Sequence, residues 1–189
     1  MTVWQRRTGT FGISGPAFLI ALTVGAQSGL AADPKPAPVV PQTPANETFG
    51  DWKKVCEVPP GSTAKVCFVF QKVNFAETDS MLLQAVAGFF RADLNDPILI
   101  LTVPLGTFLP PGLELRVKGA APLNSHFEVC MSVGCQASFK LDAARLSGLS
   151  HAKTAEVLVR DGAKKQVSIP LSLKGLPEGL DNLRTRSND

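Results

Sequence analysis

Two kinds of apolar pattern follow one another in the middle of the chain. Residues 98–103 form a continuous apolar run between Pro97 and Pro104, and this length with these flanks favours a buried strand over a helix. Residues 113–117 then alternate apolar and charged side chains, the pattern of a half-buried strand. The Pro-Pro-Gly sequence at 110–112 is typical of a turn. The centre of the chain therefore predicts two strands joined by a stiff connection.

The same patterns recur on both sides of this centre and predict an all-β domain. Residues 81–91 fit a helix or a strand, and their place between two other strands favours a strand, with Gly88 as a candidate bulge. A short helix is expected over 143–149, capped by Asp142. The set predicts an antiparallel β-sandwich or barrel-like single domain with one short helix. The further expected strands are 55–58, 65–73, 127–131, 135–141, 154–160 and 166–171.

The two ends of this domain have different signatures. Trp52 stands at its start and is expected to plug one end of the core. Residues 174–183 contain two glycines and a proline, which predicts a coil with about one helical turn. Residues 184–189 are polar and predict a frayed tail. The β-rich domain is therefore expected to span residues 49–183.

The first 32 residues have the pattern of a secretory signal peptide. Two arginines precede a mostly apolar stretch over 11–26, and small residues follow as far as Ala32. Cleavage is expected after Ala31 or Ala32. A retained membrane anchor is the alternative, but glycines and Pro16 interrupt the apolar run that a span needs. The mature protein is therefore expected in the periplasm or outside the cell.

Residues 33–48 hold five prolines in sixteen positions and predict an extended linker. The whole chain has 19 basic and 16 acidic residues, and removal of the signal leaves 19 − 2 = 17 basic residues and a net charge of +1. Nucleic acid is therefore not an expected partner. No segment of the mature chain is apolar enough to cross a bilayer.

Four cysteines lie in the expected domain, at positions 56, 67, 130 and 135. An even number in an exported chain favours disulfides. Zinc or a redox site is the alternative, but only Cys130 and Cys135 have a spacing that fits zinc, and no Cys-x-x-Cys occurs. Because each pair flanks a turn, we expect the disulfides Cys56–Cys67 and Cys130–Cys135.

The turn that is usual for Asp-Gly does not fit the apolar pattern of the hairpin around Asp161-Gly162. A two-residue turn is usual for Asp-Gly, but here it would place Val159 opposite Lys164. A loop of three or five residues instead pairs apolar side chains, and the five-residue loop sets Val159 opposite Val167. We therefore expect one of these two longer loops.

Catalytic signals are scarce. The chain has two histidines, His126 and His151, and no tyrosine, and neither histidine lies in a recognisable catalytic motif. We expect no enzyme activity, no cofactor and no metal. A binding surface is expected instead, with Phe108 and Leu109 in the loop 105–112 as contacts for a protein or glycan of the cell envelope or host surface. The alternatives are a structural or stress-related periplasmic protein and a hydrolase on a β scaffold.

Several short motifs, in order along 49–183, resemble the invasion-associated locus B family of exported bacterial proteins. They are Gly50-Asp51-Trp52, Cys56, Cys67, Val103-Pro104-Leu105-Gly106, Leu109-Pro110-Pro111-Gly112, Cys130, Gly134-Cys135 and Pro170-Leu171-Ser172-Leu173-Lys174-Gly175-Leu176. The resemblance implies a periplasmic or secreted β-rich domain, and its name associates the family with host-cell entry. It supplies no catalytic residue. Leu176 departs from the pattern, since an aromatic residue is expected there.

Overall fold

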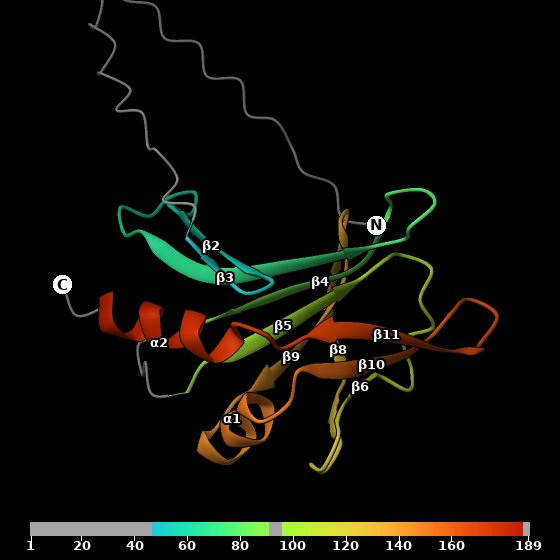
Figure 1. Ribbon diagram of the computed structural model, residues 1–189. Coiled ribbons are helices and arrows are strands. Elements are labelled where there is room, and N and C mark those ends of the chain that lie inside the picture. The colour runs from blue at the N-terminus through green and yellow to red at the C-terminus, as the bar shows by residue number, and fades with distance from the viewer. Residues whose placement is uncertain (1–46, 91–95, 187–189) are drawn as a thin grey trace, which may run out of the picture. The chain divides into compact units, whose positions relative to one another are not determined.

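The computed structural model describes residues 47–90 and 96–186 (Figure 1). The described residues all belong to one compact unit. The expected signal peptide at 1–32 and nearly all of the expected linker lie outside the described residues. The last two linker residues, Glu47 and Thr48, are described, and Thr48 belongs to the first strand.

Within the described residues, eleven strands form two antiparallel sheets, which confirms the sandwich (Figure 1). The larger sheet has the order β1-β2-β3-β4-β5-β9-β8, and the smaller has the order β11-β10-β6-β7. The larger sheet contains β1 (Thr48–Phe49), β2 (Trp52–Glu57), β3 (Val66–Asn74), β4 (Met81–Gly88), β5 (Ile98–Val103), β8 (Phe127–Met131) and β9 (Gly134–Lys140). The smaller contains β6 (Leu113–Val117), β7 (Leu123–Ser125), β10 (Thr154–Arg160) and β11 (Gln166–Ser172).

The core lies between the two sheets, where each strand turns alternate side chains inward. From the larger sheet Leu99 and Leu101 are fully buried, and from the smaller sheet Leu115 and Val157 are too. Trp52 is also fully buried, and its Nε1–H donates to the Ser172 carbonyl oxygen at 3.0 Å. The expected role of this tryptophan in the core is confirmed.

The β10–β11 hairpin has the five-residue loop that its apolar pattern required. Arg160 pairs with Gln166, Val159 with Val167 and Val157 with Ile169. A two-residue turn would have moved these side chains to the solvent side of the sheet. The strand expected over 81–91 is also confirmed as β4, but Gly88 pairs regularly with both neighbouring strands, and the irregularity lies at Val73/Asn74 instead.

The two helices agree only in part with expectation. Helix α1 (Ala143–Ser150) begins after Asp142, whose side chain accepts the Arg145 N–H at 2.9 Å, as a cap does. The C-terminal segment, expected to be a coil and a frayed tail, is instead helix α2 (Leu176–Arg186). The coil expectation is wrong because Leu176, Leu180 and Leu183 share one helix face and are buried against the core.

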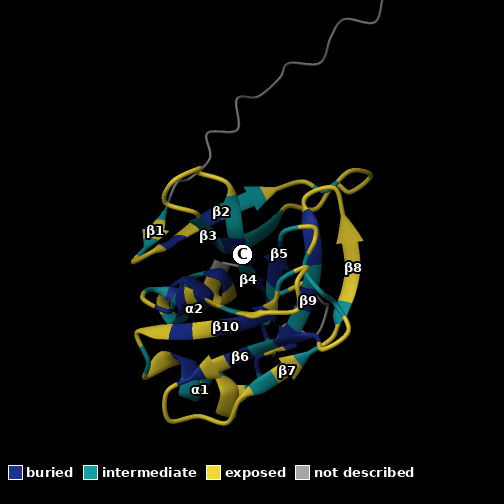
Figure 2. Ribbon diagram, turned by 90° about the vertical axis from the view of Figure 1, so that its right-hand side faces the viewer, coloured by how far each residue is buried: buried dark blue, intermediate teal, exposed yellow. Residues whose placement is uncertain are grey.

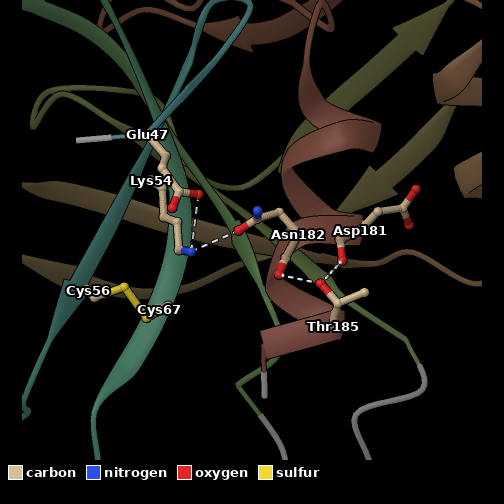
Figure 3. Close-up of polar contacts among 7 residues, drawn as sticks. All are labelled: Glu47, Lys54, Cys56, Cys67, Asp181, Asn182 and Thr185. Carbon is tan, nitrogen blue, oxygen red and sulfur yellow. Dashed lines mark hydrogen bonds and ion pairs between the residues drawn. A yellow bond between two sulfur atoms is a disulfide. The ribbon is translucent and has the colours of Figure 1, made fainter. Parts of the chain in front are cut away.

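A buried lysine joins α2 to the larger sheet (Figure 3). The Lys54 side chain points inward from β2 and is 4% exposed. Its Nζ donates to Asn182 Oδ1 at 2.8 Å and lies 3.4 Å from Glu47 Oε2. A buried charge needs such partners, because an unpaired one would carry a desolvation cost of several kcal/mol. The contact therefore fixes where α2 lies on the sheet.

Removal of one partner of this lysine should destabilise the domain more than removal of the charge itself. Asn182→Leu is expected to lower the free energy of unfolding by about 1–3 kcal/mol, because it leaves a buried ammonium group with one partner fewer. Lys54→Met removes the charge along with its desolvation cost and should be nearly neutral. Urea denaturation of both variants checks this. A larger loss for Lys54→Met than for Asn182→Leu would contradict it.

Candidate binding cleft

The loop between β5 and β6 and the loop of the β10–β11 hairpin meet at one end of the sandwich. The Phe108 N–H donates to the Arg160 carbonyl oxygen at 2.8 Å, which ties the first loop to the end of β10. Within the same loop, Thr107 Oγ1 donates to the Pro104 carbonyl oxygen at 2.8 Å. The approach is close, since a Cβ on Gly162 would lie 3.2 Å from the Gly106 carbonyl oxygen. These contacts hold the two loops in a fixed relation.

Between these loops the sandwich opens into a cleft of about 410 Å³, which we call the end cleft. Both sheets contribute to its walls, and the β3–β4 loop adds one aromatic residue. Its lining residues are Phe75, Leu82, Val103, Pro104, Leu105, Gly106, Thr107, Val159, Arg160, Asp161, Gly162, Val167 and Ile169.

The floor and the mouth of the end cleft differ in exposure. Val103 from the larger sheet and Ile169 from the smaller sheet are both buried, and they form the floor of the cleft. At the mouth, Phe75 is 47% exposed and Leu105 is 58% exposed. Large apolar side chains with half their surface in water are uncommon next to a cavity that could have received them. The cleft thus offers a continuous apolar surface from solvent to core.

The charged residues at the rim of the end cleft form hydrogen bonds within the loop of the β10–β11 hairpin. Arg160 Nη1 donates to the Lys164 carbonyl oxygen at 2.9 Å, and Asp161 Oδ1 accepts the Lys165 N–H at 2.9 Å. Lys164 Nζ lies 5.2 Å from the centroid of the Phe108 ring, a cation–π distance. These bonds order the loop and leave apolar contact as the main chemistry of the cleft.

The residues expected as partner contacts, Phe108 and Leu109, lie in the loop between β5 and β6. Phe108 and Leu109 are both half-buried, and Leu109 packs against the core. Neither is among the residues that line the end cleft. Leu105 and Phe75 are exposed apolar residues that do line it. Leu105 belongs to the loop 105–112 that the sequence indicated, whereas Phe75 lies in the polar segment 74–80, which offered no such signal.

Both expected disulfides are present, Cys56–Cys67 and Cys130–Cys135. Each joins directly opposed residues of neighbouring antiparallel strands, β2 with β3 and β8 with β9. Figure 3 shows the first of them beside the Lys54 contact. No cysteine is free. The covalent links therefore join neighbouring strands of the larger sheet in two places. No cysteine lines the end cleft, but Cys135 pairs with Val103, which does.

The two histidines, His126 and His151, lie at the surface, neither lines the end cleft, and His151 Nδ1 lies 3.2 Å from Ser150 Oγ. The same Nδ1 atom lies 2.7 Å from the Ser147 carbonyl oxygen at the end of α1. The hydrogen bond from Arg116 to the Glu114 carboxylate raises the pKa of that guanidinium on β6. Within residues 47–90 and 96–186 no group of acidic, histidine or cysteine side chains is placed to hold a metal ion.

These features define a class of protein: an antiparallel β-sandwich, stapled by two disulfides, with an apolar cleft between loops at one end. Residues 52–184 match the family described as "Invasion associated locus B (IalB) protein". Since the match covers well over half of the chain, the chain belongs to this family.

Among solved structures, the fold is similar to the crystal structure of invasion associated protein b from Bartonella henselae. The TM-score is 0.64 with 21% sequence identity, over 75% of this chain and 96% of that chain. No curated protein matches the sequence. Among the described residues, no helix is both long and apolar enough to cross a membrane.

Proposed function

We propose that this chain is an exported, non-catalytic binding protein of the bacterial envelope, and that the end cleft receives an apolar segment of a partner protein. The observation that carries this proposal is the pair of exposed apolar side chains, Phe75 and Leu105, at the mouth of an apolar cleft. The cleft volume of about 410 Å³ is within the range of small ligand sites and has room for one or two large side chains.

The chemistry of the lining favours a protein partner over a glycan. A sugar presents many hydroxyl groups and needs several free hydrogen-bonding groups placed around it. Most of the side chains that line the cleft are apolar, and the charged rim residues Arg160 and Asp161 each hold one hydrogen bond to the backbone of their own loop. The large apolar side chains of a peptide segment match this lining, and each stabilises a complex by about 1.5–3 kcal/mol when it leaves water.

Two further features support an exported location. Two disulfides suit an oxidising compartment, and both lie in the described domain. The first 32 residues carry the pattern of a signal peptide. The name of the family associates it with invasion, so the partner is either a protein of the cell's own envelope or one on a host surface.

A panel of blocked pentapeptides tests this proposal. Peptides with one central phenylalanine or leucine among glycine and serine should bind the protein, and peptides of glycine and serine alone should not. Binding should weaken about tenfold or more in Leu105→Asp, since a carboxylate would then stand at the mouth of the cleft. In Val167→Trp an indole occupies the cleft itself, and binding should be lost. Isothermal titration calorimetry measures both effects.

Val133→Asp is the matched control, because Val133 is also 58% exposed but lies outside the end cleft. It should bind the peptides as the unaltered protein does. Equal weakening in the control and in Leu105→Asp would mean that binding depends on net charge or general apolar exposure. Equal affinity of the unaltered protein for apolar and polar peptides would overturn the proposal.

A further inference from the structure

The four sheet edges of this sandwich are not equally protected from pairing with another strand. Edge β1 has two residues and edge β7 has three, so neither offers a template of useful length. Edge β11 contains Pro170, which lacks an N–H donor, and the Ser172 carbonyl oxygen at its end accepts from Trp52. The remaining edge, β8, has five residues and neither proline nor lysine.

Strand β8 also exposes apolar side chains. Figure 2 shows this strand mostly in the colour of exposed residues, at the rim of the larger sheet. Val129 is 46% exposed and Met131 is 45% exposed. Proteins usually place charged residues on such an edge, and here Glu128 is the only charge in the strand. No other described segment pairs with the open side of β8. The Cys130–Cys135 disulfide holds the strand in extended form.

The register of the β8–β9 hairpin decides which backbone groups point outward. Met131 and Gly134 flank a two-residue turn and so form the hydrogen-bonded pair nearest to it. Cys130 and Cys135 are the next pair, which exchanges no hydrogen bonds, and their Cα atoms are only 3.9 Å apart, as fits the closer spacing of such pairs. The N–H and C=O of Cys130 therefore point to the open edge.

We propose that β8 pairs antiparallel with β8 of a second copy of this chain, with Cys130 directly opposite Cys130 of the second copy. A two-fold axis through this point lets the two Cys130 residues exchange both backbone hydrogen bonds. Val129 then lies opposite Met131 of the second copy, so exposed apolar side chains cover one another. The two sheets continue into one, and two open edges disappear.

The charges near β8 are compatible with pairing to a second copy of the chain in this register. Pairing about Cys130 sets Glu128 opposite Ser132 of the second copy, so the two carboxylates do not face each other. A register that set Glu128 opposite Glu128 would place like charges together. The irregularity between Phe127 and Val129 limits regular pairing to a short stretch, and the dimer is therefore weak. This proposal does not depend on what the end cleft binds.

Sedimentation equilibrium of the protein purified from the periplasm, over a wide range of concentrations, tests the proposal. The unaltered protein should pass from monomer to dimer as its concentration rises. Val129→Lys should weaken the dimer about tenfold or more, because it places an ammonium group at both symmetric positions of the contact. Ser132→Lys should strengthen the dimer, because it brings a lysine opposite Glu128 of the second copy.

Leu105→Lys is the control, since Leu105 is exposed at the end cleft and should leave the dimer unchanged. A monomer at every concentration would overturn the proposal. A dimer that Val129→Lys leaves intact would place the contact elsewhere and overturn it equally. Weakening by Ser132→Lys would contradict the register centred on Cys130. Because Val129 and Ser132 are both exposed, thermal unfolding of the two variants should match that of the unaltered protein.

Discussion

Trp52→Ala is expected to lower the free energy of unfolding by about 3–5 kcal/mol, the usual cost of emptying a fully buried aromatic site. The side chain has no exposed surface, and its indole N–H donates to the Ser172 carbonyl oxygen. The substitution leaves a cavity between the sheets and takes away the indole donor that bonds to the Ser172 carbonyl oxygen on β11. Urea denaturation followed by circular dichroism measures the effect as a fall in the midpoint at an unchanged slope.

Trp52→Phe is the matched comparison. It keeps most of the apolar volume and removes only the indole donor, so its cost should be clearly smaller than that of Trp52→Ala. Equal costs would mean that the hydrogen bond to Ser172, and not the packing, carries the contribution of this residue. A cost below about 1 kcal/mol for Trp52→Ala would contradict its place in the core.

Removal of the disulfides should produce the second large effect. Cys56→Ala with Cys67→Ala is expected to cost about 3 kcal/mol, and Cys130→Ala with Cys135→Ala about 2 kcal/mol, because the first disulfide closes the longer loop in the unfolded chain. The separations along the sequence are 11 and 5 residues. Urea denaturation without reducing agent compares the two double variants.

Reduction of the unaltered protein supplies the control for this experiment. Dithiothreitol should bring its midpoint close to that of a variant lacking both disulfides, and should not change the variant itself. A larger loss on removal of Cys130–Cys135 than of Cys56–Cys67 would contradict the loop-length argument. It would also indicate that the hairpin of β8 and β9 depends on its covalent link more than on its backbone pairing.

Strands with a clear pattern of apolar and polar side chains could be predicted from the sequence. The run at Ile98–Val103 is apolar on both faces and became β5, which lies between β4 and β9 in the larger sheet. Leu113, Leu115 and Val117 alternate with charged residues and turn their side chains into the core. The five-residue hairpin loop followed from the same rule, because only a few registers pair apolar with apolar side chains.

Strands and helices whose own residues show no clear apolar pattern could not be predicted. Strands β1 and β7 have two and three residues and exist because a neighbouring strand offers pairing partners. Pro177 and Gly179 argued against a helix over the residues of α2, although the first turn of a helix tolerates a proline. A Cβ at Gly179 would lie 2.8 Å from Val69 Cγ1, so this glycine permits the helix to approach β3 closely. Packing of α2 against the sheet outweighs the low helix propensity of these two residues.

The end cleft could be placed in its loop but not in its details. The sequence indicated the loop after β5, and Pro104 and Leu105 do line the cleft. Which apolar loop residue faces solvent could not be predicted, because a loop lacks the alternation that separates inside from outside. The second wall comes from the β10–β11 hairpin, more than fifty residues along the chain, and a single sequence does not show that proximity.

Methyl NMR of the protein during titration with a blocked phenylalanine peptide tests the binding role of the end cleft most directly. Binding in the cleft predicts that the methyl resonances of Val103, Val159 and Ile169 shift together with one saturation curve, since an aromatic ring would lie against all three. The methyl groups of Val129, on the edge strand β8, should not move, since no residue of β8 lines the cleft. Shifts confined to β8, or no shift in the three cleft methyl groups at saturation, would contradict the account.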